Sequence, residues 1–188
     1  MTPSLLSNPA LRPVFYLIGR LGLFLFGWKT HGKMPDMKKY ILIAAPHSSN
    51  WDFVFFLFII FTFGIPVHWM GKHTMFMFPF KRLLKRLGGI PIDRTQKGNT
   101  VAAIADEYRK AHRLIVTIAP SGTRKPVTEW KTGFYRIAHR AGVPIVCGFV
   151  DYKKKIGGVG PVVMPSGDMD ADLERIRDFY TDKSGRYD

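Results

Sequence analysis

Residues 40–63 read YILIAAPHSSNWDFVFFLFIIFTF, two apolar runs joined by a short polar turn. The first run, Tyr40–Ala45, is short and aliphatic, which is typical of a buried strand. The second run, Asp52–Phe63, has the length of a core helix, because a membrane-spanning helix needs ~20 apolar residues. A strand that leads directly into a helix indicates an α/β fold.

The same alternation of short apolar runs and helical patterns continues along the rest of the chain. It predicts a single α/β domain with a mixed, largely parallel sheet flanked by helices, preceded by an N-terminal apolar helical segment. The further strands are expected at Val67–Met70, Ile90–Ile92, Leu114–Ala119, Pro144–Val150 and Pro161–Met164, and the further helices at Thr74–Leu87, Asn99–His112, Thr132–Ala141 and Met169–Tyr180.

The N-terminal segment, residues 1–35, contains an apolar helix over Val14–Trp28 that Arg20 interrupts. We do not expect a signal peptide, because no basic region precedes the helix and no small-residue cleavage site follows it. The helix either lies in a membrane interface, with its cations at the head groups, or packs on its own domain. Residues 36–188 form the predicted α/β domain.

The chain carries a formal net charge of +14, and 15 Phe and 4 Trp accompany that charge. An anionic partner is therefore expected, and long apolar runs favour a membrane surface over nucleic acid. One helix repeats basic residues at a spacing of four, which suits either a solvated face or anionic lipid: Lys81, Arg82, Lys85 and Arg86. These features predict a peripheral or monotopic protein on the cytoplasmic face of a membrane.

Cys147 is the single cysteine, so no intrachain disulfide can form. It lies in an apolar segment, which predicts a buried and unreactive thiol. The absence of disulfide pairing is consistent with a cytoplasmic protein.

His47 and Asp52 lie in the turn between the first strand and its helix, with four residues between them. If the helix begins near Trp51, Asp52 lies in the first helical turn and can fold back toward His47. An imidazole held by a carboxylate through one nitrogen can accept a proton through the other. The alternative is an Asp that caps the helix beside an exposed His.

Four sequence blocks occur in one order: "HSSNWD" (47–52), "GGIPIDR" (88–94), "APSGTR" (119–124) and "VPIVCGF" (143–149). On these blocks the chain resembles the glycerolipid acyltransferase family of lysophosphatidate acyltransferases, and residues 36–188 resemble its catalytic domain. The resemblance implies transfer of a fatty acyl group from acyl-CoA or acyl-carrier protein to a lipid hydroxyl, as in phospholipid biosynthesis. It implies that His47 is the general base and that Asp52 orients it. No cofactor beyond the acyl carrier is expected, and no metal, because the remaining histidines lack ligand spacing.

Several residues beyond the strands suit an anionic substrate. Arg94 and Arg124 each follow a strand at the carboxyl edge of the predicted sheet, where ligands of such sheets bind, and an arginine there suits a phosphate. Gly122 would allow a close backbone approach, Thr123 could donate a hydroxyl, and Lys72 lies beyond a third strand.

Ser121 departs from the family pattern, which has Glu at this place in the third block. We expect altered acceptor choice with retained catalysis. Two alternatives stay open: a catalytically degenerate membrane-binding protein, and a serine hydrolase that uses Ser121 with His47 and Asp52. The Gly-x-Ser-x-Gly elbow of such hydrolases is absent here.

Overall fold

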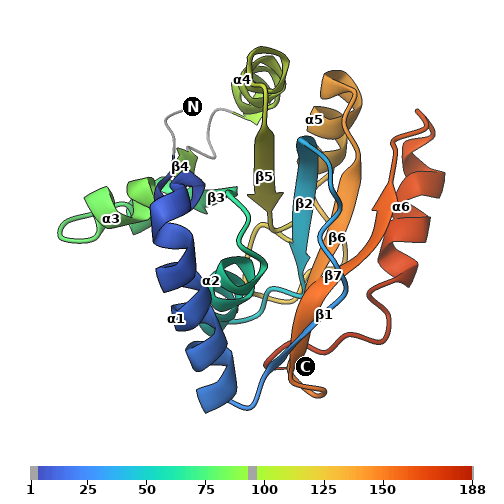
Figure 1. Cartoon of the computed structure of the whole chain (residues 1–188). Coiled ribbons are helices and arrows are strands. Elements are labelled where there is room, and N and C mark those ends of the chain that lie inside the picture. The colour runs from blue at the N-terminus through green and yellow to red at the C-terminus, as the bar shows by residue number, and fades with distance from the viewer. Residues whose placement is uncertain (1–3, 93–96, 188) are drawn as a thin grey trace.

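A computed structural model describes residues 4–92 and 97–187, and within them the chain forms one seven-stranded sheet (Figure 1). The strand order is β1-β7-β6-β2-β5-β3-β4. All neighbouring strands are parallel except β6 and β7, which confirms the predicted α/β class with a mixed, largely parallel sheet. The strands are β1 (Lys29–His31), β2 (Lys39–Ala45), β3 (His68–Lys72), β4 (Gly89–Ile92), β5 (Leu114–Ile118), β6 (Ile145–Asp151) and β7 (Ile156–Val163).

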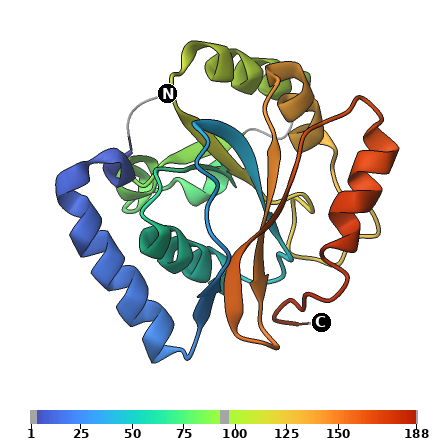
Figure 2. The same ribbon diagram turned by 45° about the vertical axis from the view of Figure 1, so that its right-hand side comes forward.

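Helices cover both faces of the sheet (Figures 1 and 2). On one face α4, α5 and α6 share a buried core with the sheet side chains that point to that face, including Ile41 and Ile43 of β2. On the other face α2 packs on Tyr40 and Leu42, and α1 lies outside α2. The helices are α1 (Arg12–Leu25), α2 (Trp51–Phe63), α3 (Lys81–Arg86), α4 (Lys97–Lys110), α5 (Gly133–Ala141) and α6 (Met169–Asp178), with short 3-10 turns η1 (Leu5–Ser7), η2 (Pro9–Leu11) and η3 (His73–Met75).

Helix α1 approaches α2 closely at two glycines, beside the packed side chains of Phe15 and Leu23. A Cβ at Gly22 would come within 2.6 Å of the Phe58 ring, and one at Gly19 within 2.6 Å of the Phe58 carbonyl oxygen. Because this narrow side of α1 faces α2, the other large apolar residues of α1 point outward. The exposed ones are Val14, Tyr16, Leu17, Ile18, Leu21, Phe24 and Leu25.

Two predicted elements differ from the structure, and one observed strand was not predicted. The predicted helix Thr74–Leu87 is wrong: η3 and the short α3 are separated by a turn that contains Pro79, which cannot continue a helix. The predicted strand Pro161–Met164 is too short, because β7 begins at Ile156. Strand β1 was not predicted, since its three residues, KTH, carry no apolar pattern.

The parallel strands β2, β3, β5 and β6 all present their carboxyl ends at one edge of the sheet. The turn with His47 follows β2, Lys72 ends β3, and the Ser121 segment follows β5. Within residues 4–92 and 97–187, the helices are all too short or too polar to cross a membrane.

Candidate active site

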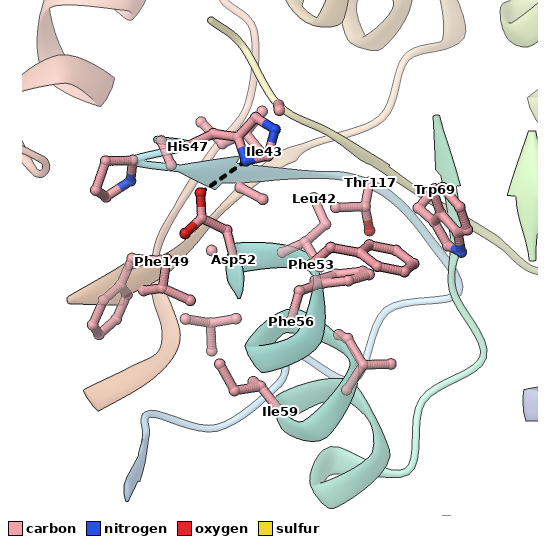
Figure 3. A pocket seen from close by; sticks show the side chains of 18 of the residues that line it. Leu42, Ile43, His47, Asp52, Phe53, Phe56, Ile59, Trp69, Thr117 and Phe149 are labelled. Carbon is pink, nitrogen blue, oxygen red and sulfur yellow. Dashed lines mark hydrogen bonds and ion pairs between the residues drawn. The ribbon is translucent and has the colours of Figure 1, made fainter. Parts of the chain in front are cut away.

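The turn after β2 brings His47 against Asp52. His47 Nδ1 lies 3.0 Å from Asp52 Oδ2, as the dashed line in Figure 3 shows. The same oxygen accepts hydrogen bonds from the backbone N–H groups of Ser48 at 2.7 Å and Ser49 at 2.8 Å. Because Asp52 lies in the first turn of α2, its carboxylate reaches back to these N–H groups before the helix.

The second carboxylate oxygen of Asp52 has a different partner. Asp52 Oδ1 accepts a hydrogen bond from the Tyr152 hydroxyl at 2.7 Å. Burial by itself raises the pKa of Asp52, but hydrogen bonds from His47, Ser49 and Tyr152 lower the pKa below its ordinary value. The carboxylate is therefore ionised at neutral pH.

An ionised carboxylate only accepts hydrogen bonds, so the proton of a neutral His47 ring lies on Nδ1. This tautomer leaves the Nε2 lone pair available to take a proton from a substrate. The His47 side chain is 28% exposed and that of Asp52 is 5% exposed, so the imidazole is accessible while the carboxylate behind it is not. The pair has the arrangement of a general base with its orienting group.

An apolar pocket of about 130 Å³ lies beside the pair, between α2 and the sheet (Figure 3). Strand β2 contributes Leu42, α2 contributes Phe53, Phe56 and Ile59, and β3 contributes Trp69. The hydroxyl of Thr117 also lines the pocket, and this buried group has no hydrogen-bond partner among the described residues. Such a lining suits a hydrocarbon chain.

The Ser121 segment forms a tight turn after β5. Gly122 has φ of 63°, in the left-handed region that favours glycine, and its N–H donates to the carbonyl of Ala119 at 3.0 Å. The Ser121 hydroxyl donates to the carbonyl of Thr123 at 2.8 Å. Thr123 Oγ1 in turn accepts a hydrogen bond from the backbone N–H of Lys125 at 3.3 Å.

Of the predicted site residues, the structure brings His47 and Asp52 together at the pocket. Arg124 and Lys72 are exposed at the same edge of the sheet. Arg94 lies outside the described residues. The binding roles given to Lys72, Arg94 and the Ser121–Arg124 turn remain predictions.

Two residues of this edge were missed by the sequence reasoning. The side chain of Lys131 crosses Gly122, since its Nζ lies 3.0 Å from the place of a Cβ on that glycine. Tyr152 directly follows β6, a position that the carboxyl-edge argument applied to Arg124 would also have selected. Cys147 on β6 is buried, and burial raises the pKa of its thiol to about 11, so the thiol is not a nucleophile.

Comparison with known proteins gives a family and a similar fold. The model of the acyltransferase family matches residues 29–149. No curated protein matches the chain significantly. The crystal structure of the 1-acyl-sn-glycerophosphate (LPA) acyltransferase PlsC from Thermotoga maritima is similar, with a TM-score of 0.64 and 16% sequence identity over 93% of this chain and 82% of that one. At that identity the likeness establishes a shared fold.

Proposed function

The chain belongs to the acyltransferase family, and we propose that it moves a fatty acyl group from acyl-CoA or acyl-carrier protein to a hydroxyl of a lysophospholipid or related lipid. One observation carries the proposal: the buried carboxylate of Asp52 holds His47 beside an apolar pocket. Acyl transfer to an alcohol requires a base, and an apolar pocket beside that base suits the hydrocarbon of an acyl group.

In the proposed reaction, Nε2 of His47 takes the proton of the acceptor hydroxyl as the oxygen attacks the thioester carbonyl. The new C–O bond forms and the C–S bond breaks, and the imidazolium returns its proton to the departing thiolate. Asp52 stabilises the imidazolium while it exists. No acyl-enzyme intermediate is needed, because the thioester is already activated.

The apolar pocket is the proposed site of the acyl chain. Each methylene that leaves water there contributes about 0.8 kcal/mol. Phe53, Phe56 and Ile59 follow one another at one turn or less on α2, so the chain would run along that helix. Pocket depth along α2 would then set the preferred chain length.

The cationic groups at the carboxyl edge are the proposed site of an acceptor phosphate. Lys72 and Arg124 are exposed there, and Lys131 adds a charge beside Gly122. Ser121, in place of the family's Glu, leaves this edge with one negative charge fewer. We therefore propose an acceptor more anionic, or less dependent on a carboxylate, than a lysophosphatidate.

The variant Ser121→Glu tests acceptor choice. Its ratios of kcat/KM across a panel of lysolipids should shift toward less anionic acceptors, because discrimination depends on differential transition-state binding. An unchanged acceptor profile would show that position 121 does not set specificity. Gain of activity in a wild type that is inert toward every acceptor would instead indicate a degenerate enzyme.

Membrane association is proposed from two exposed surfaces on one side of the molecule (Figures 1 and 2). On α1, Phe24 is 78% and Leu25 is 70% exposed. Before α3, Phe78 is 95% exposed, next to the basic residues of that helix. Apolar side chains at the acyl boundary and cations at the head groups suit a peripheral or monotopic protein on the cytoplasmic face of a membrane.

The deciding experiment incubates the purified protein with labelled acyl-CoA or acyl-carrier protein and lysolipids in anionic vesicles. Thioester loss matched by acylated lipid, at a rate that falls with added salt, is the expected result. Thioester loss without acylated lipid would favour the hydrolase, as would labelling by a fluorophosphonate that Ser121→Ala abolishes. Equal association with neutral and anionic vesicles at low salt would contradict the proposed electrostatic contribution to membrane binding.

A further inference from the structure

Tyr152 lies beyond the matched family region, residues 29–149, yet it touches the carboxylate behind the proposed base. The three donors to Asp52 Oδ2, from His47, Ser48 and Ser49, all belong to the same turn. Asp52 Oδ1 accepts from Tyr152, which lies 100 residues away in the sequence on the β6–β7 hairpin. The hydroxyl is therefore an independent constraint on the carboxylate.

The ring of Tyr152 is fixed by its neighbours. It makes edge-on contacts with Trp28, at a centroid distance of 5.0 Å, and with Phe55, at 5.7 Å. Its backbone N–H donates to the carbonyl of Ser184 at 3.0 Å. Burial of the phenol and its bond to Asp52 raise the pKa of Tyr152, so the hydroxyl keeps its proton and acts as a donor.

Residues 184–186 contact both the β6–β7 hairpin and the turn that contains His47. The backbone N–H of Arg186 donates to Ser48 Oγ at 2.8 Å, and the Arg186 guanidinium lies 5.3 Å from the centroid of the Trp51 ring. Residues 184–186 thus join the hairpin that carries Tyr152 to the turn that carries the base. The Tyr152 hydroxyl and the Asp52 carboxylate are therefore fixed relative to each other.

We propose that Tyr152 is a positioning residue for acyl transfer: its hydroxyl locks the Asp52 carboxylate, so that Oδ2 stays directed at His47 Nδ1 and Nε2 stays available as the base. Without this bond the carboxylate is held through Oδ2 alone, and its charge has one donor fewer. The inference rests on the proposed function, because a positioning role needs a reaction.

The test compares Tyr152→Phe with Tyr135→Phe. The control removes a bond of the same kind, since the Tyr135 hydroxyl donates to the buried carboxylate of Asp172 at 2.8 Å. In Tyr152→Phe we expect kcat to fall about tenfold, the scale of one charge-assisted hydrogen bond, with KM for both substrates unchanged. Tyr135→Phe should keep wild-type kcat.

The pH profile separates positioning from general support of the fold. Loss of the hydroxyl removes a bond that lowers the pKa of Asp52, so the carboxylate is protonated at higher pH. The acid limb of kcat/KM reports the base itself, and a carboxylate with one donor fewer attracts the imidazolium more strongly, so this limb should move to higher pH in Tyr152→Phe alone. Equal losses of kcat in both variants, or an unmoved acid limb, would overturn the proposal.

A measurement without turnover separates this proposal from the proposed function. The nitrogen chemical shifts of labelled His47 report which nitrogen carries the proton. Tyr152→Phe should increase the share of the Nε2–H tautomer, whether or not acyl transfer is the reaction, and an unchanged share would contradict the positioning role. If Tyr152→Phe does not fold, fluorotyrosine at position 152 keeps the ring and strengthens the donor, and the acid limb should then move to lower pH.

Discussion

Asp52 and Asp172 are two buried carboxylates built on the same local plan. Each lies in the first turn of a helix, Asp52 in α2 and Asp172 in α6, and they are 4% and 1% exposed. Each accepts a hydrogen bond from a backbone N–H just before its helix and another from a tyrosine hydroxyl far away in the sequence. At both sites the hydrogen bond from the tyrosine joins a helix to a neighbouring element.

The two sites differ in the third partner. Asp52 holds the imidazole of His47, whereas Asp172 holds the hydroxyl of Ser166 at 2.9 Å. Asp52 also lines the apolar pocket, which Asp172 does not. A buried carboxylate at the start of a helix can thus have a purely structural role. It becomes part of a proposed active site where an accessible imidazole and a pocket lie beside it.

The largest expected effect comes from removing the third partner at each site. His47→Ala should lower the rate of acyl transfer by about 10²- to 10⁴-fold without unfolding the protein, because no other histidine lines the pocket among the described residues. Ser166→Ala, the matched change at Asp172, should leave the rate unchanged. Steady-state assays and thermal melting measure both. Near-wild-type turnover by a folded His47→Ala protein would refute the assignment of the base.

The carboxylates themselves give the next test. Asp52→Asn should lower kcat by on the order of 10²- to 10⁴-fold, because the amide cannot stabilise the imidazolium and favours the wrong tautomer. Asp172→Asn should leave kcat unchanged and lower the free energy of unfolding by about 1–3 kcal/mol, since an amide N–H would face the donors of Ser166 and Tyr135. Urea unfolding and turnover of both variants decide between the roles. A comparable loss of kcat in Asp172→Asn would erase the distinction.

The sequence predicted what is local and missed what is distant. His47 and Asp52 lie in one turn, so their spacing indicated that Asp52 can fold back toward His47, and the alternation around them predicted the parallel sheet. The place of Tyr152 just after β6 could have marked it, but its bond to Asp52, 100 residues away, could not be predicted from the sequence. The approach of Lys131 to Gly122 likewise depends on how the chain returns after the Ser121 turn. Pro79 was present in the sequence, but the leucines and basic residues around it suggested a helix that the proline interrupts.

The smallest expected effect concerns acid stability. Burial raises the pKa of Asp172, but hydrogen bonds from Ser166 and Tyr135 lower it below its ordinary value, and the pKa of Asp52 is lowered in the same way. A carboxyl with a lowered folded-state pKa stabilises the protein above its unfolded pKa of about 4, and this contribution is lost as the pH falls through the folded value.

In acid, the free energies of unfolding of the two asparagine variants should therefore approach that of the wild type. The difference in free energy of unfolding between the wild type and Asp172→Asn should narrow by about 1 kcal/mol between neutral pH and pH ~3, because protonation removes the same charge from the wild type that the substitution removes. The difference in free energy of unfolding between the wild type and Asp52→Asn should narrow by a similar amount, since both carboxylates accept the same kinds of hydrogen bond. Urea titrations across this range measure the gap. A gap that stays constant for Asp172 but narrows for Asp52 would mean that the likeness between the two sites ends at their geometry.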